Sequence, residues 1–192
     1  MPKDQRVGCT IFRLNFIRLN LLLISGWGGK VSVNPLWDFS LQHYAKTTVQ
    51  QRCLQLQEEA GANVNVVLLT LWLATQKRLF DHNLVLHRAE LLHWHEQVIV
   101  PLRQARFGVR QAELSESLYQ TIKQSELDAE RVEQDILYSL LPEFAEASDE
   151  LKLLELADWN LRAYLQLLPL AEELMGPVSE QLVDDVFGET RC

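Results

Sequence analysis

The residues that come closest to a recognisable chemistry are a group of neighbouring histidines and glutamates. They are His82, His87, Glu90, His93, His95 and Glu96. Imidazole and carboxylate groups are common zinc ligands, so such a group could indicate a metal site. However, no histidine pair has the i, i+4 spacing of the H-E-x-x-H zinc motif. On a helix with about 100° per residue, the histidines after position 82 point in widely separated directions. We therefore predict no metal ion at this segment.

His87 has a second possible role. On a helix it would share a face with Leu91, Trp94 and Val98, and its imidazole would then be partly buried. A core histidine with one hydrogen bond is the favoured interpretation. The alternative is an acid/base residue in a pocket, with a pKa that burial has moved.

The tryptophans give the largest apolar side chains of the chain, and four of them fall on different predicted helices. These are Trp37, Trp72, Trp94 and Trp159. Large aromatic residues usually fill a helical core, and we expect this use here, most firmly for Trp72. The alternative is a pocket for a small apolar ligand, formed by Trp37, Trp72, His87 and Trp94.

Other signatures of catalysis are missing from the sequence. It contains no Gly-rich phosphate loop, no nucleophile elbow and no Cys/His pairing. The acidic pairs Glu172-Glu173 and Asp184-Asp185 lack the D-D-x-x-D pattern of helical isoprenoid synthases, and we interpret them as solvated. The sequence therefore predicts no catalytic residue and no cofactor, and it favours a protein that is not an enzyme.

Composition narrows the class of protein. The chain has 192 residues, of which 47% are hydrophobic, as expected for one globular domain. A net charge of -8 argues against nucleic acid and against anionic membrane surfaces as partners. Cys9, Cys53 and Cys192 are far apart and odd in number, which favours a reducing cytoplasm over a disulfide framework.

The chain divides into three predicted parts. Residues 1–33 carry an apolar stretch that polar residues interrupt, too short for export or a membrane span. They are either a disordered extension or the product of a mis-assigned start, with translation beginning at Val31 or Val33. Residues 34–170 form the predicted helical domain, and residues 171–192 form an acidic tail with a short helix.

Capping and breaking signals place the helices. Gly and Pro are scarce, which favours few, long elements. The predicted helices begin at Asn34 and at Thr47 or Thr48, and a third, capped by Asn63, covers Val64–Leu73. A fourth covers Leu84–Val100, where Pro101 bends or ends it, and Gly108 closes a short continuation. The others cover Ala112–Leu141 and Ser148 or Asp149 to Leu168, and a short one follows Gly176-Pro177. Val64–Leu73 is apolar nearly all round and should lie at the centre, although a buried strand is a rival interpretation of Val64–Leu69. The predicted fold is all-α: a compact bundle of about six helices, with one long helix and a short C-terminal helix.

The long predicted helix carries a narrow apolar seam. Ile122, Ala129 and Ile136 recur every seven residues, and Val132 stands in a second row with Ser125 and Ser139. Charged residues between 126 and 135 flank this seam. Such a pattern is typical of a coiled-coil contact, either with an antiparallel neighbour such as the 148–168 helix or with a second chain.

Three short strings resemble a known family. They are N-P-L-W-D-F-S from Asn34, G-A-N-V-N from Gly61 and L-W-L-A from Leu71. They are similar to a small family of proteobacterial proteins that is classified as a domain of unknown function. The resemblance implies a bacterial cytoplasmic helical protein with a start near Val31 or Val33, and it implies no activity, cofactor or catalytic residue.

The function that the sequence favours is a non-enzymatic protein-interaction module. Its partner would be another protein or a second copy of the chain, bound through the long helix or the acidic tail. The alternative is a helical bundle with a small apolar-ligand pocket or an enzyme activity without a recognisable motif.

Overall fold

The computed structural model describes residues 34–188. The predictions for residues 1–33 and for the last four residues lie outside this part. Within residues 34–188 the fold is all-α, as predicted, and the only strand-like pairing described is an isolated bridge between Arg78 and Glu146. No helix in this part of the chain has both the length and the apolar character needed to cross a membrane.

The caps predicted at Asn34 and Asn63 and the stop predicted at Gly61 are confirmed, whereas the cap predicted at Thr47 or Thr48 is wrong, because Lys46 holds that position and makes no side-chain hydrogen bond. α1 (Pro35–Tyr44) is capped by Asn34, whose side chain accepts hydrogen bonds from the backbone N–H of Leu36 and Trp37. α2 (Thr47–Ala60) ends at Gly61, which has a φ of 68°. This left-handed conformation is strained for residues with a Cβ. Asn63 caps α3 (Val64–Thr75) by accepting from Asn65 N–H.

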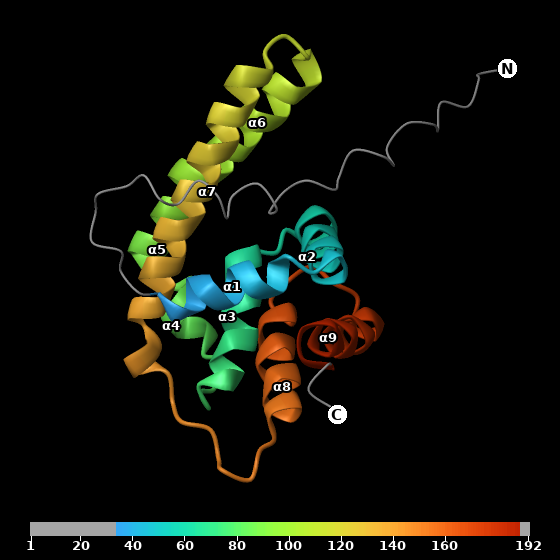
Figure 1. The fold of residues 1–192 in the computed structure, drawn as a ribbon. Coiled ribbons are helices and arrows are strands. Elements are labelled where there is room, and N and C mark those ends of the chain that lie inside the picture. Colours follow the sequence, from blue (N-terminus) through green and yellow to red (C-terminus); the bar gives the residue numbers. More distant parts are fainter. Residues whose placement is uncertain (1–33, 189–192) are drawn as a thin grey trace, which may run out of the picture.

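The core lies around α3, whose residues 65–74 are all buried. This confirms the predicted central helix and rules out the rival strand. α8 (Leu153–Leu165) packs along α3, and α9 (Glu172–Phe187) packs on α8 and α2 (Figure 1). Four apolar side chains of α9 are buried in the same core; they are Leu182, Val183, Val186 and Phe187. α9 begins before Gly176-Pro177, not after it as predicted, because a proline this near the helix start removes only one backbone hydrogen bond.

The predicted helix Leu84–Val100 is wrong at its start, and its continuation beyond Pro101 runs to Ala112, past the predicted stop at Gly108. The chain forms α4 (His82–Leu86), then breaks, and continues as α5 (Ala89–Trp94), the π-helical turn η3 (His95–Ile99) and α6 (Val100–Ala112). The break lets both Val85 and Leu91 enter the core. On a continuous helix, residues six apart would point about 120° away from each other. At the other end Pro101 does not stop the helix, because the wider turn of η3 comes directly before it.

α6 and α7 (Glu116–Ser139) form an antiparallel pair that projects from the body of the molecule, hereafter called the arm (Figure 1). Ser115 caps α7 by accepting from Leu118 N–H. The long helix therefore pairs within the chain, as one of the predicted alternatives required. Its main neighbour is the preceding α6; α8, which was expected there, lies along α3 instead. A short 3-10 turn, η4 (Leu141–Glu143), leads from α7 to the loop before α8.

Candidate functional site at the base of the arm

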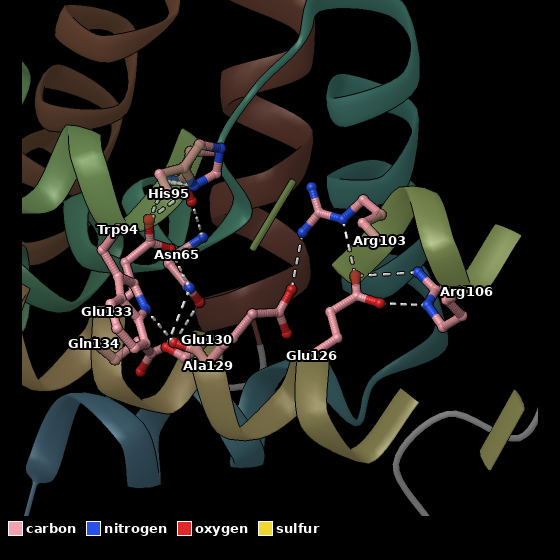
Figure 2. Close-up of polar contacts among 11 residues, drawn as sticks. Asn65, Trp94, His95, Arg103, Arg106, Glu126, Ala129, Glu130, Glu133 and Gln134 are labelled. Carbon is pink, nitrogen blue, oxygen red and sulfur yellow. Dashed lines mark hydrogen bonds and ion pairs between the residues drawn. The ribbon is translucent and has the colours of Figure 1, made fainter. Parts of the chain in front are cut away.

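Three glutamates stand on one face of α7 where the arm meets the body. Glu126, Glu130 and Glu133 are spaced i, i+4 and i+7, so they share a face. Glu126 and Glu133 are buried, and the Glu130 side chain is 23% exposed. Glu126 and Glu133, predicted to flank the apolar seam, therefore lie within the buried face itself. The face that they occupy is turned toward α6, η3 and α3 (Figure 2).

Two arginines of α6 neutralise the outer part of this face. Arg103 donates from Nε to Glu126 Oε1 and from Nη2 to Glu130 Oε1, each at 2.9 Å. Arg106 is buried and donates to both carboxylate oxygens of Glu126. Charge-assisted, two-pronged pairs of this kind fix both distance and orientation. They hold the two helices of the arm in one register.

Glu133 receives a different set of donors. Asn65 Nδ2 donates to its Oε2 at 2.5 Å, and Asn63 Nδ2 donates to its Oε1 at 2.9 Å. His95 Nδ1 lies 2.8 Å from the same Oε1. Asn63 cannot turn its amide oxygen toward this site, because that oxygen caps α3. Asn63 Nδ2 also lies 3.0 Å from His95 Nδ1, so this ring nitrogen faces both the amide and the carboxylate, and Nε2 points away from the carboxylate (Figure 2).

Neutral hydrogen bonds extend the cluster to the other helices. Gln134 Nε2 donates to Asn65 Oδ1 at 2.8 Å, and Ser40 on α1 donates to Gln134 Oε1 at 3.0 Å. The indole N–H of Trp94 donates to the carbonyl of Ala129 at 2.9 Å. We call the whole set the network. Its members are Ser40, Asn63, Asn65, Trp94, His95, Arg103, Arg106, Glu126, Glu130, Glu133 and Gln134. It ties α1, α3, α5, η3 and α6 to α7.

The network contains more carboxylates than guanidinium groups. Burial raises the pKa of Glu130 from 4.5 to about 7; Arg103 opposes this rise, and Glu126 and Glu133 add to it. Burial also raises the pKa of the Tyr44 phenol, which lies in the same electrostatic environment. The arrangement can therefore hold a proton near neutral pH, besides holding the arm on the body.

The predicted pocket residues do not line a common site. Trp72 is buried in the core, as predicted, with its ring 5.7 Å from that of Tyr138. Trp37 lies under the guanidinium of Arg131, and Trp94 is held by the backbone of α7. His87 ends α4 and is exposed, so the prediction of a partly buried imidazole is wrong; the helix break turns it away from Leu91 and Trp94.

Trp159 and most of the neighbouring histidines lie on the surface. Trp159 is 63% exposed on α8, so its predicted place in the core is wrong. The core-facing side of α8 is already filled, by Leu156, Ala157, Asn160, Leu161, Tyr164 and Leu165. Of the histidines between positions 82 and 95, His82 and His93 are exposed, and only His95 joins the network. Residues 34–188 bring no three His, Cys, Asp or Glu side chains together as a potential metal site. A shallow surface pocket on α2 is lined by Thr48, Gln51, Arg52 and Gln55.

The seam residues lie close to the network without forming it alone. Ala129 is buried, Ile122 and Ile136 are partly buried, and Val132 is largely on the surface. The observed contact stripe reads Ile122, Glu126, Ala129, Glu133 and Ile136, with alternating spacings of four and three. This continuous spacing is the signal in the sequence that could have placed two glutamates inside. Because glutamates are usually exposed, their spacing alone did not predict that these two would be buried.

The outer end of the arm has the opposite character. Three apolar side chains are exposed there, Phe107 (43%), Leu114 (88%) and Leu118 (48%), and we call residues 107–118 the tip. Glu113 ends α6 in the left-handed conformation, with a φ of 53°. The turn from α6 to α7 therefore holds Leu114 out in solvent.

Comparison with known proteins gives one match. A family model described as Protein of unknown function (DUF2390) matches residues 35–137, more than half of the chain. The matched range contains every residue of the network and the whole of the tip. No curated protein and no solved structure matches the chain.

Proposed function

Because the chain belongs to this family of unknown function, we propose a function from its own structure: it is a non-enzymatic protein-interaction module. The arm inserts its tip into an apolar groove of a partner protein. The network holds the base of the arm, so the tip is presented in a fixed direction. A cytoplasmic location, which the cysteine pattern favours, is part of the same proposal.

The exposure of the tip is the observation that carries this proposal. Leu114 is 88% exposed in the turn between α6 and α7, with Phe107 and Leu118 exposed on those two helices. The turn is the projecting end of this helical hairpin (Figure 1). Apolar side chains concentrated at a projecting end are typical of interaction sites. Amphipathic helices commonly bind by placing spaced apolar residues into a groove.

The charges near the tip indicate the chemistry of the partner. Arg110 and Lys123 are matched in number by Glu113 and Glu116, whereas the chain as a whole carries -8. This balance favours an apolar groove over a polyanion, which would require an excess of cations. A second copy of the chain is the less favoured occupant, because the surface pocket described on this chain is lined by polar and charged side chains of α2 and would not receive an apolar tip.

Site-specific crosslinking tests the proposal. A photoreactive phenylalanine analogue is placed at Leu114, and in a control chain at Gln166, which is exposed at the end of α8, outside the arm. We expect one protein to crosslink from position 114 and not from position 166. That protein, once purified, should bind the wild-type chain at least tenfold more tightly than the Leu114→Glu variant.

Three outcomes would contradict the proposal. The first is equal crosslinking from positions 114 and 166. The second is unchanged affinity of the captured protein for Leu114→Glu. The third is crosslinking only between copies of the chain, which would make the tip a self-association site. A Leu174→Glu variant, changed at another exposed leucine, controls for the added charge.

A further inference from the structure

We propose that Arg106 is a positioning residue for the tip. Its guanidinium group, held on α7 by Glu126, lies over the Phe107 ring and fixes the direction in which that ring faces a partner. This role rests on the proposed function, because it concerns the surface through which the arm would bind. The outermost pair of the network then does more than hold α6 on α7, since it also orients a side chain of the tip.

The guanidinium group of Arg106 has little freedom to move. Arg106 is 8% exposed, and its Nε and Nη2 donate to the two carboxylate oxygens of Glu126 (Figure 2). The hydroxyl of Tyr119, also on α7, is a further hydrogen-bond partner of the same group. Moving the guanidinium group away would break both hydrogen bonds to a buried carboxylate, which is costly. α7 therefore fixes the place of this cation.

The Phe107 ring lies against this fixed cation. The guanidinium carbon of Arg106 lies over the ring, 4.7 Å from its centroid. An attractive cation–π contact extends to about 6 Å, so the two groups are within range. Successive residues of a helix point about 100° apart and do not face each other by default. The contact therefore depends on where α7 holds the guanidinium group, and the geometry of α6 alone would not produce it.

A ring that is held in this way is well suited to bind a partner. Phe107 remains 43% exposed although the guanidinium group covers part of the ring. A side chain that already occupies one rotamer loses less conformational entropy when it is bound. Phe107 is also the only aromatic residue of the tip, and aromatic side chains are enriched at the centres of interfaces. Orienting this ring in advance would therefore favour its insertion into an apolar groove.

The rotamer of Phe107 tests this role in the full chain without any partner. NMR measures it from the three-bond couplings about χ1 and from the nuclear Overhauser contacts of the ring protons. We expect one χ1 rotamer in the wild-type chain, with ring contacts to the Arg106 side chain. Averaging of Phe107 over several rotamers in the wild-type chain would overturn the proposal, and this outcome needs no variant.

Matched variants assign the rotamer to the guanidinium group. Glu126→Leu and Arg106→Leu together remove the cation with the carboxylate that it neutralises, and a leucine ends at Cδ, short of the place of the guanidinium carbon. Phe107 should then populate several rotamers. Arg110→Leu, at an exposed arginine of the same helix, removes a positive charge near the tip and should leave the rotamer unchanged. A single rotamer that persists in the double variant would overturn the proposal.

Binding to the protein captured through Leu114 tests the effect on recognition. The double variant should bind this protein about two- to fivefold more weakly than the wild-type chain, as expected for the loss of an exposed cation–π contact. In a chain that already carries Phe107→Ala, the same double change should weaken binding no further, because Arg106 acts through the ring. Equal losses with and without Phe107 would show a general loosening of the arm and overturn the proposal. Failure to capture any protein would contradict the proposed function alone, since the rotamer measurement contains no partner.

Discussion

Two regions bind helices to the body of this protein, and they do so by different physics. Around α3 and α8 the contacts are almost entirely apolar, and the energy depends on area and close packing. At the base of the arm the buried groups are carboxylates, guanidinium groups and amides, each with named partners. A charged group in such a place is tolerated only while its partners remain. The core should therefore respond to lost volume, and the network to lost partners.

The largest expected effect comes from emptying the core. Trp72→Ala should lower the free energy of unfolding by about 3–5 kcal/mol, because it removes a buried indole and its contact with Tyr138. Urea denaturation measures the loss. Trp159→Ala is the matched control, since that indole is exposed and should matter by less than about 1 kcal/mol. Equal losses from the two variants would contradict the assignment of the core.

Breaking one charged pair should be nearly as damaging, and removing both partners should be milder. Glu126→Leu leaves buried Arg106 without its carboxylate and should cost about 3 kcal/mol. Adding Arg106→Leu should recover most of that loss, because the remaining site is apolar and Arg103 keeps Glu130. Denaturation of the two single variants and the double variant completes the cycle. Additive losses would show that the pair does not act as a unit.

The next effect depends on pH and belongs to the network alone. The pKa of Glu130 in the folded state, about 7, is above its ordinary value of 4.5, so the folded state binds the extra proton between these values. The stability that this group contributes is complete below about pH 4.5 and falls as the pH rises through 7, by about 1–3 kcal/mol in total. The difference in unfolding free energy between wild type and Glu130→Gln, measured from pH 4.5 to pH 8, should follow this course. A difference that rises in favour of wild type with pH would reverse the sign and refute it.

The smallest effect on stability is expected at the tip. Leu114→Glu changes a side chain that is 88% exposed and should alter the free energy of unfolding by less than about 0.5 kcal/mol. Leu137→Glu places the same charge at a buried position of α7 and should prevent stable folding. Thermal melts of the two variants make the comparison. A strongly destabilised Leu114→Glu would mean that the tip belongs to the folded core.

The sequence was informative wherever a local signal was strong. Asn34 and Asn63 mark helix starts because their side chains accept hydrogen bonds from backbone N–H groups of the first turn. Gly61 marks a helix end because glycine adopts the left-handed conformation without steric cost. The sequence was less informative between 84 and 112. There the break after Leu86 has no Pro or Gly beside it that would predict a helix end. The chain also stays helical past Pro101, where a π-helical turn comes directly before the proline-containing helix. Both outcomes depend on which side chains the core accepts.

The candidate site shows the same division. The sequence alone predicts the all-α class, the apolar α3 at its centre and the long helix that forms half of the arm. These predictions follow from composition, capping and the length of apolar runs. Only the tertiary structure decided that Glu126 and Glu133 face inward, that His95 alone among the histidines enters the network, and that α7 pairs with α6. A glutamate is on the surface by default, and it becomes buried only when distant segments bring donors to it. The arginines of α6 and the asparagines of α3 are such donors, and their arrival at α7 is a property of the fold.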